Sequence, residues 1–255
     1  MSRQPIWMSP LEQSVRRYLS TESSGHDPWH AFRVCDLANR LAQAIGADAE
    51  IVLASALLHD IGHGFGRADH AEKGAFLAQD LLKKSGFPEA KIQSVISCIE
   101  HHEWLPGRAG DPELPTVEYQ AFADADRLDA LGAVGIARTF AFGGAHGRPI
   151  WDPEPGAAAS GVYGVSSIHH FYDKLLHLPD DMYTEPGKRL AVQRVAVMKQ
   201  FLRSFNLQWE GKDVQVSALA TEPGLSLGPL QKSSVKVRDR IRRIFAAILQ
   251  PNPIN

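Results

Sequence analysis

The sequence predicts an all-α protein, and three observations support that fold class. Apolar side chains recur at helical spacing along almost the whole chain. No segment of any length alternates between apolar and polar residues, as a half-buried strand would. The apolar stretches also begin at capping residues and end at glycines, as helices commonly do. We therefore expect a single globular helical bundle.

Capping patterns place five helices in the first part of the chain. Ser9 with Glu12, and Asp69 with Glu72, have the spacing of a capping box, in which side chains satisfy free backbone N–H groups. Asp27 followed by a proline is a further start signal. A stretch rich in alanine and leucine, after residue 48, predicts a deeply buried helix. The expected helices cover residues 9–18, 27–46, 48–59, 69–84 and 88–102.

The second part of the chain carries three more apolar stretches with helical spacing. They predict helices over residues 116–142, 166–178 and 185–209, the first of them long and ended by two glycines. Beyond residue 211 the chain becomes low in charge and rich in turn-forming residues, which predicts a linker. Residues 236–249 predict a short basic amphipathic helix, docked or partly disordered rather than bound to a membrane surface. We expect a helical domain over residues 1–211, with its motif region at 27–142, and a linker and tail helix over 212–255.

Composition narrows the class of protein. The formal net charge is -2 over 255 residues, so no basic excess suggests nucleic-acid binding. No apolar run approaches the roughly 20 residues that span a bilayer, and the first residues do not resemble a secretory signal. Cys35 and Cys98 suit small buried side chains in a reducing compartment. These features predict a cytoplasmic protein without a membrane span, and none of them indicates an oligomeric state.

The adjacent pair His59-Asp60 is the first candidate for chemistry. It follows Leu57 and Leu58 and precedes Ile61, so a carboxylate would be buried in an apolar run. Burying an ionised carboxylate costs several kcal/mol unless it is paired or binds a metal. Imidazole and carboxylate together favour Mn, Fe, Co, Ni or Zn over ions that prefer oxygen ligands alone.

His30 and Asp126 could complete the ligand set of such a metal. His30 lies on its own expected helix beside Trp29, and Asp126 lies in an alanine-rich helical stretch with Asp129 three residues further on. His30 alone would equally suit a hydrogen-bonded core histidine, and Asp126 alone an ion pair with a nearby arginine. Together with the His-Asp pair they predict one metal site, with Asp129 orienting a ligand or the substrate.

These residues resemble a known family. The order His…His-Asp…Asp, with the pair ending a helix and the last aspartate followed by Asp-Ala-Leu, is similar to the HD-domain metal-dependent phosphohydrolases. Residues 124–140 and 170–176 look like a bacterial subgroup that contains nucleotide pyrophosphohydrolases. The resemblance implies that His30, His59, Asp60 and Asp126 are the metal ligands. It also implies an all-α HD-domain fold.

Four further histidines could hold a second metal or act in catalysis. His101-His102-Glu103 is similar to an element of cyclic-dinucleotide phosphodiesterases in the superfamily, where added histidines bind a second ion. His70 could complete that site, although the residues after Glu103 depart from the element. Alternatively, His70 is a residue at a helix start and His102 is exposed. His63, three residues after Asp60, is a candidate acid or base or a histidine without a role.

The resemblance implies a hydrolase acting on a nucleotide, with a nucleoside triphosphate split to monophosphate and pyrophosphate. A divalent transition metal, Mn by preference with Co, Ni, Fe, Zn or Mg as alternatives, would lower the pKa of a water molecule and polarise a phosphoryl oxygen. Cationic side chains that could bind phosphate are Arg33, Arg127, Arg138, Lys174 and Arg189, each of which could equally be a surface charge.

Three other functions stay open on the sequence. A two-iron oxygenase of the same superfamily would use His70, His101 and His102 for its second iron. A cyclic-dinucleotide or other phosphodiesterase would also use a second ion. A binding module without catalysis would not need the four metal ligands.

Overall fold

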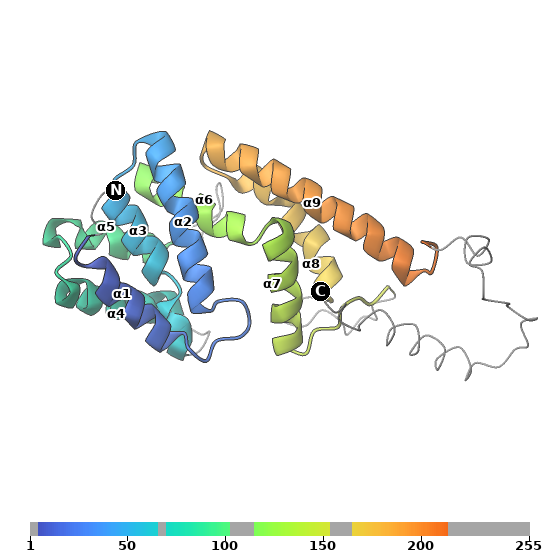
Figure 1. Cartoon of the computed structure of the whole chain (residues 1–255), viewed down its shortest axis with the longest axis horizontal. Helices are drawn as coiled ribbons and strands as arrows, with labels where there is room; N and C mark the ends of the chain where they lie inside the picture. Colours follow the sequence, from blue (N-terminus) through green and yellow to red (C-terminus); the bar gives the residue numbers. More distant parts are fainter. Residues whose placement is uncertain (1–4, 66–69, 103–114, 154–164, 214–255) are drawn as a thin grey trace, which may run out of the picture. The chain divides into compact units, whose positions relative to one another are not determined.

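The computed structural model describes residues 5–65, 70–102, 115–153 and 165–213 (Figure 1). The predicted all-α fold is confirmed, because the described residues form helices and no strands. In chain order the elements are α1 (Met8–Tyr18), α2 (Pro28–Ile45), α3 (Ala49–Leu58), the 3-10 helix η1 (Ile61–Phe65), α4 (His70–Ser85), α5 (Glu89–Glu100), α6 (Val117–Asp129), α7 (Gly132–Ala145), α8 (Ser167–Asp173), the 3-10 helix η2 (Leu175–Asp181) and α9 (Glu185–Trp209).

Local signals fix the two helices that carry most of the site. Asp27 caps α2 by accepting a hydrogen bond from the backbone N–H of His30 at 2.8 Å, and Pro28 occupies the first helical position. Gly46 ends the helix with a φ of 75°, a left-handed conformation that glycine adopts without steric cost. Asp48 caps α3 in the same way through the N–H of Glu50. These caps confirm the predicted bounds of both helices.

Three details of the predicted elements are wrong. The Ser9 capping box does not form, since α1 starts one residue earlier and Trp7 caps it without a side-chain hydrogen bond. The expected helix over 116–142 is two helices, because Leu131 is extended and Gly132 has a φ of 73°. The expected helix over 166–178 stops at Asp173, where Lys174 leaves helical geometry, and continues as η2.

The packing of α2 brings the site together. This helix contacts both α3 and α6, and Figure 1 shows the three side by side. The side chains of Ala31, Val34 and Ala38 are fully buried on α2, as are Leu58 on α3 and Phe122 on α6. Burial of apolar surface supplies about 25 cal/mol per Å². The apolar contact therefore holds three sequence-distant segments, each of which carries polar residues of the site, in fixed register.

The chain divides into two compact units, Met1–Arg203 and Ser204–Asn255. In the second unit the described residues continue α9 to Trp209, whose ring stacks on Phe205 at 5.6 Å between centroids. The predicted tail helix over 236–249 lies outside the described residues. Cys35 and Cys98 are buried and free of disulfides, as expected. None of the helices in the described ranges has the length and apolar character that a bilayer crossing requires.

Candidate metal centre

The four residues predicted as metal ligands meet in one place. His30 comes from the first turn of α2, and His59 is the residue that ends α3. Asp60 follows directly, before η1, and Asp126 lies one turn from the end of α6. The two histidines and Asp60 are buried, whereas 26% of the Asp126 side chain is exposed. The cluster therefore has a buried base and one side open toward solvent.

The ligand atoms of this cluster are spaced as they would be around one ion. His30 Nε2 lies 3.2 Å from His59 Nε2 and 3.3 Å from both Asp60 Oδ2 and Asp126 Oδ1. His59 Nε2 lies 3.3 Å from Asp60 Oδ2 and 3.6 Å from Asp126 Oδ1. Ligand atoms about 2.1 Å from one ion, at angles of about 90° to 110°, are about 3.0 to 3.4 Å apart. At these separations His30 Nε2, His59 Nε2 and Asp60 Oδ2 fit a divalent cation, and Asp126 Oδ1 approaches both nitrogens.

The second nitrogen of each histidine is held by the protein. His30 Nδ1 lies 2.8 Å from Asp129 Oδ2, and His59 Nδ1 lies 2.9 Å from the carbonyl oxygen of Ala56. When these nitrogens donate, the tautomer of each ring leaves the Nε2 lone pair facing the cluster. Metal-binding histidines are usually oriented by a carboxylate or carbonyl in this way. The arrangement supports the predicted orienting role of Asp129.

Two of the predicted cationic residues hold Asp129 in place. Arg33 donates to both carboxylate oxygens of Asp129 at 2.9 Å, and Arg138 donates to Oδ2 at 3.1 Å. Arg138 also donates to the carbonyl oxygen of Gly25 at 2.8 Å. Paired donors fix the plane of a carboxylate as well as its position. Arg33 and Arg138 thus contact the residue behind the metal cluster.

The buried carboxylates of the cluster favour positive charge on the groups around them. Burial and Arg138 lower the pKa of His30, but hydrogen bonds to Asp126, Asp129 and Asp60 outweigh them and raise it to about 10. Burial alone would raise the pKa of Asp60, yet His59, His26 and His30 hold it well below its usual range. The pKa of Asp126 is also lowered, against burial, by His30 and His59. Without a metal His30 retains its proton at neutral pH, so a metal ion that binds there must displace it.

The structure separates the other four predicted histidines. His63 Nε2 lies 3.4 Å from Asp60 Oδ1, and His102 Nε2 lies 3.9 Å from the same oxygen. This oxygen is the one that does not face His30 and His59. His101 turns back to its own helix, with Nδ1 2.8 Å from the carbonyl oxygen of Ser97. His70 begins α4, but its side chain lies outside the described residues.

The remaining predicted cations lie elsewhere. Arg127 is buried, donates to the carbonyl oxygen of Asp181 at 3.2 Å and approaches Asp124 at 3.6 Å. Arg189 is exposed on α9 and forms an ion pair with Glu185. Lys174 is exposed at the end of α8. None of these three contacts any of the four predicted metal ligands through an ion pair or hydrogen bond found among the described residues.

The sequence prediction missed His26. Its Nδ1 lies 2.7 Å from Asp60 Oδ2, the shortest contact that any histidine makes with this carboxylate among those described. Its ring stacks on that of His63 at 4.6 Å between centroids. Both rings line a pocket of about 280 Å³ beside the cluster. The only signal in the sequence was a histidine directly before the capping Asp27, where a short loop turns into α2.

Fold and site together define an all-α protein with a His/Asp centre suited to a divalent metal. The family model described as HD domain matches residues 29–131. The chain is 36% identical over 203 residues to the uncharacterized protein YpgQ of Bacillus subtilis, a match that covers 80% of this chain and 94% of the relative.

Solved structures agree with this match. The crystal structure of Bacillus subtilis YpgQ in complex with ADP has a TM-score of 0.61 and 32% identity, covering 77% of this chain and 97% of that one. An HD-superfamily hydrolase from Bacillus thuringiensis has a TM-score of 0.61 and 34% identity, covering 80% of this chain and 96% of that one. The chain belongs to the HD-domain superfamily of metal-dependent phosphohydrolases, whose members bind divalent metals.

Proposed function

We propose that this protein hydrolyses nucleotides with a divalent metal held by His30, His59, Asp60 and Asp126. The observation that carries the proposal is that the Nε2 atoms of His30 and His59 lie 3.2 to 3.6 Å from each other and from oxygens of Asp60 and Asp126. A bound divalent cation would lower the pKa of a water molecule and polarise a phosphoryl oxygen. The crystal structure of YpgQ with ADP supports a nucleotide as the ligand class.

The favoured reaction splits a nucleoside triphosphate. One water molecule is consumed, the bond between the α-phosphorus and its bridging oxygen to the β-phosphorus breaks, and a nucleoside monophosphate and pyrophosphate leave. The open side at Asp126 gives the phosphates a route to the cluster, since the other three ligands are buried. Transition metals that accept both nitrogen and oxygen ligands, Mn first among them, suit the donor set.

His63 is our candidate for moving a proton in this reaction. Only 11% of its side chain is exposed, and it lines the pocket while its Nε2 faces Asp60 Oδ1 at 3.4 Å. A residue in this position can hold a proton next to the phosphate oxygens without being a ligand of the ion between His30 and His59. Replacing it with asparagine should lower kcat more than it weakens metal binding.

A second candidate function follows from Asp60 Oδ1, the carboxylate oxygen that does not face His30 and His59. His63 and His102 both approach this oxygen, at 3.4 and 3.9 Å, so a second ion could share Asp60. Two ions would favour a phosphodiesterase of the cyclic-dinucleotide type or, with iron, an oxygenase. Metal content of anaerobically purified protein separates them: one Mn or Co per chain supports the first proposal, and two irons support the oxygenase.

Substrate turnover tests the main proposal. Nucleoside triphosphates should release pyrophosphate with Mn, Co, Ni or Mg, and the Asp60→Ala variant should be inactive under every metal. His102→Ala should be nearly silent if the centre holds one ion. Release of pyrophosphate or phosphate that does not exceed that of the Asp60→Ala control, with any metal, would contradict the proposal.

A further inference from the structure

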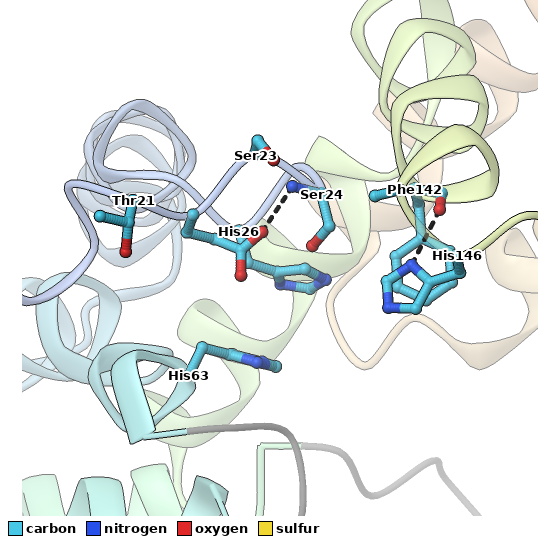
Figure 2. Close-up of a pocket in the computed structure, with 9 residues that line it drawn as sticks. Thr21, Ser23, Ser24, His26, His63, Phe142 and His146 are labelled. Atoms are coloured by element: carbon cyan, nitrogen blue, oxygen red, sulfur yellow. Dashed lines mark hydrogen bonds between the residues drawn. The ribbon is translucent and has the colours of Figure 1, made fainter.

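The pocket beside the metal cluster is built from two sides. One side is the loop before α2, with Thr21 to Ser24 and His26, together with His63 of η1. The other side is the end of α7, with Phe142, Ala145 and His146. Figure 2 shows the His26 ring between His63 and the aromatic pair of Phe142 and His146, whose rings stack at 4.0 Å between centroids. Four of the nine lining residues that are described thus carry aromatic rings.

A single carboxylate distinguishes this pocket from a phosphate site. Glu22 lines it, and one of its carboxylate oxygens accepts a hydrogen bond from the backbone N–H of Ser24. Burial raises the pKa of Glu22, but the bonds from Ser24 and the nearby His26 and His63 lower it below its usual value. Among the residues that the structure describes, the lining includes no lysine or arginine. An ionised carboxylate in such a lining repels phosphate groups and attracts hydroxyl and amine donors.

Two residues link the pocket to the metal cluster. Of its three lining histidines, His26 and His63 also contact Asp60, at 2.7 Å and 3.4 Å. A substrate whose phosphates lie at the cluster would therefore place its next chemical group here. A volume of about 280 Å³ is near the lower end of ligand pockets, roughly 300 to 1,000 Å³. That volume suits one sugar or one base ring rather than a long chain of phosphates.

We propose that this pocket binds the nucleoside end of the substrate and that Glu22 accepts a hydrogen bond from a sugar hydroxyl. The inference rests on the proposed nucleotide hydrolysis and adds the orientation of the substrate in the site. An ionised carboxylate has about four lone-pair positions, so the bond from Ser24 leaves acceptors for a hydroxyl donor. The rings of Phe142 and His146, which line the pocket, offer aromatic contact to a ring of the nucleoside.

A cycle of substrate and protein changes tests the role of Glu22. In metal-loaded wild-type protein, kcat/KM is measured for a nucleoside triphosphate and for its 2′-deoxy and 3′-deoxy analogues. Removing the hydroxyl that Glu22 binds should lower kcat/KM about tenfold to a hundredfold, the range of a charge-assisted hydrogen bond. Glu22→Gln should lower kcat/KM for the parent nucleotide by a similar factor and remove the difference between parent and analogue. Glu89→Gln, an exposed carboxylate on α5, is the matched control.

The outcomes separate substrate binding from a supporting role. If Glu22 only positions His26 and His63, Glu22→Gln will reduce activity on parent and deoxy analogues equally, and the proposal is overturned. If the wild type discriminates against neither analogue, it is also overturned. Should the protein fail to hydrolyse nucleotides, the same cycle is measured as dissociation constants of the nucleotides. If these constants show no coupling between Glu22 and the hydroxyl, the proposed role of the pocket is refuted. If they show the coupling but the protein has no turnover, only the proposed reaction is refuted.

Discussion

The two faces of α6 use the same residue type in opposite ways. On one face Asp124 is fully buried and accepts hydrogen bonds at 2.7 to 2.8 Å from the N–H groups of Tyr183 and Thr184 and from the Thr184 hydroxyl. On the other face Asp126 is partly exposed, and its nearest imidazole nitrogens lie at 3.3 and 3.6 Å. The short distances show that the Asp124 carboxylate is hydrogen-bonded within the fold. The longer distances at Asp126 leave room for an ion.

Charge separates the two aspartates as clearly as distance does. Burial raises the pKa of Asp124, and its hydrogen bonds only partly offset that effect. Burial acts in the same direction on Asp126, but His30 and His59 reverse it and lower the pKa. Arg127, 3.6 Å from Asp124, also lowers its pKa but does not reverse the effect of burial. A buried aspartate that belongs to a metal site is therefore marked by imidazole neighbours rather than by burial itself.

Removing Asp126 should have the largest effect on activity. Asp126→Ala takes away one ligand of the centre, and the loss of metal chemistry is expected to lower kcat/KM by about a thousandfold or more. Metal content after purification should fall with it. Asp80→Ala, an exposed position on α4, is the control, and retained metal with full activity would contradict the ligand role.

Removing Asp124 should damage stability instead. Asp124→Ala leaves the N–H groups of Tyr183 and Thr184 without their acceptor and removes the charge that Arg127 approaches at 3.6 Å, which is expected to cost about 3 kcal/mol in the free energy of unfolding. Activity per folded, metal-loaded molecule should stay near that of the wild type. Urea unfolding combined with metal analysis checks both expectations. Loss of metal at unchanged stability would show that the two faces of α6 are not separate.

Sequence patterns were sufficient for the parts that depend on neighbouring residues. The bounds of α2 follow from Asp27, a first-turn proline and Gly46, each of which acts on backbone groups within a few residues. The His59-Asp60 pair was visible because two polar groups interrupt an apolar run. Local pattern also misled at Gly132, since the apolar spacing continues through the break between α6 and α7 and a single positive φ resets the helix direction.

Tertiary contacts decided the rest. Arg127 and Asp126 are adjacent in sequence, yet only the packing of α6 shows that the arginine turns to Asp124 and Asp181. His26 contacts Asp60 across 34 residues, and no spacing rule connects a loop histidine to the end of α3. Likewise, no sequence pattern singles out Glu22, which draws attention only through its place in the pocket lining. Residues that act through such contacts can be identified only from the tertiary structure.

A substitution at Asp129 tests whether the face of α6 that carries Asp126 contributes more to metal binding than its ligand. Asp129→Asn keeps an oxygen that can accept from His30 Nδ1 but loses the charge that Arg33 and Arg138 bind. Changes to groups that orient a metal ligand typically weaken metal affinity tenfold to a hundredfold. Competition with a chelator measures this dissociation constant, and Asp124→Asn serves as the comparison on the other face. Equal affinities for the two variants would remove Asp129 from the centre.

The pH dependence of stability tests the difference between the two faces of α6 and requires the smallest change to the chain. In metal-free protein the pKa of His30 is raised from 6.5 to about 10. A raised imidazole pKa contributes stability that is fully present below pH 6.5 and is lost as pH rises through about 10. A bound metal keeps His30 neutral, so this slope should vanish in metal-loaded protein. Urea midpoints between pH 6.5 and 9, with and without metal, test it in the wild type and in Asp124→Asn, which should keep the slope. Parallel curves with and without metal would show that His30 does not give up its proton to an ion.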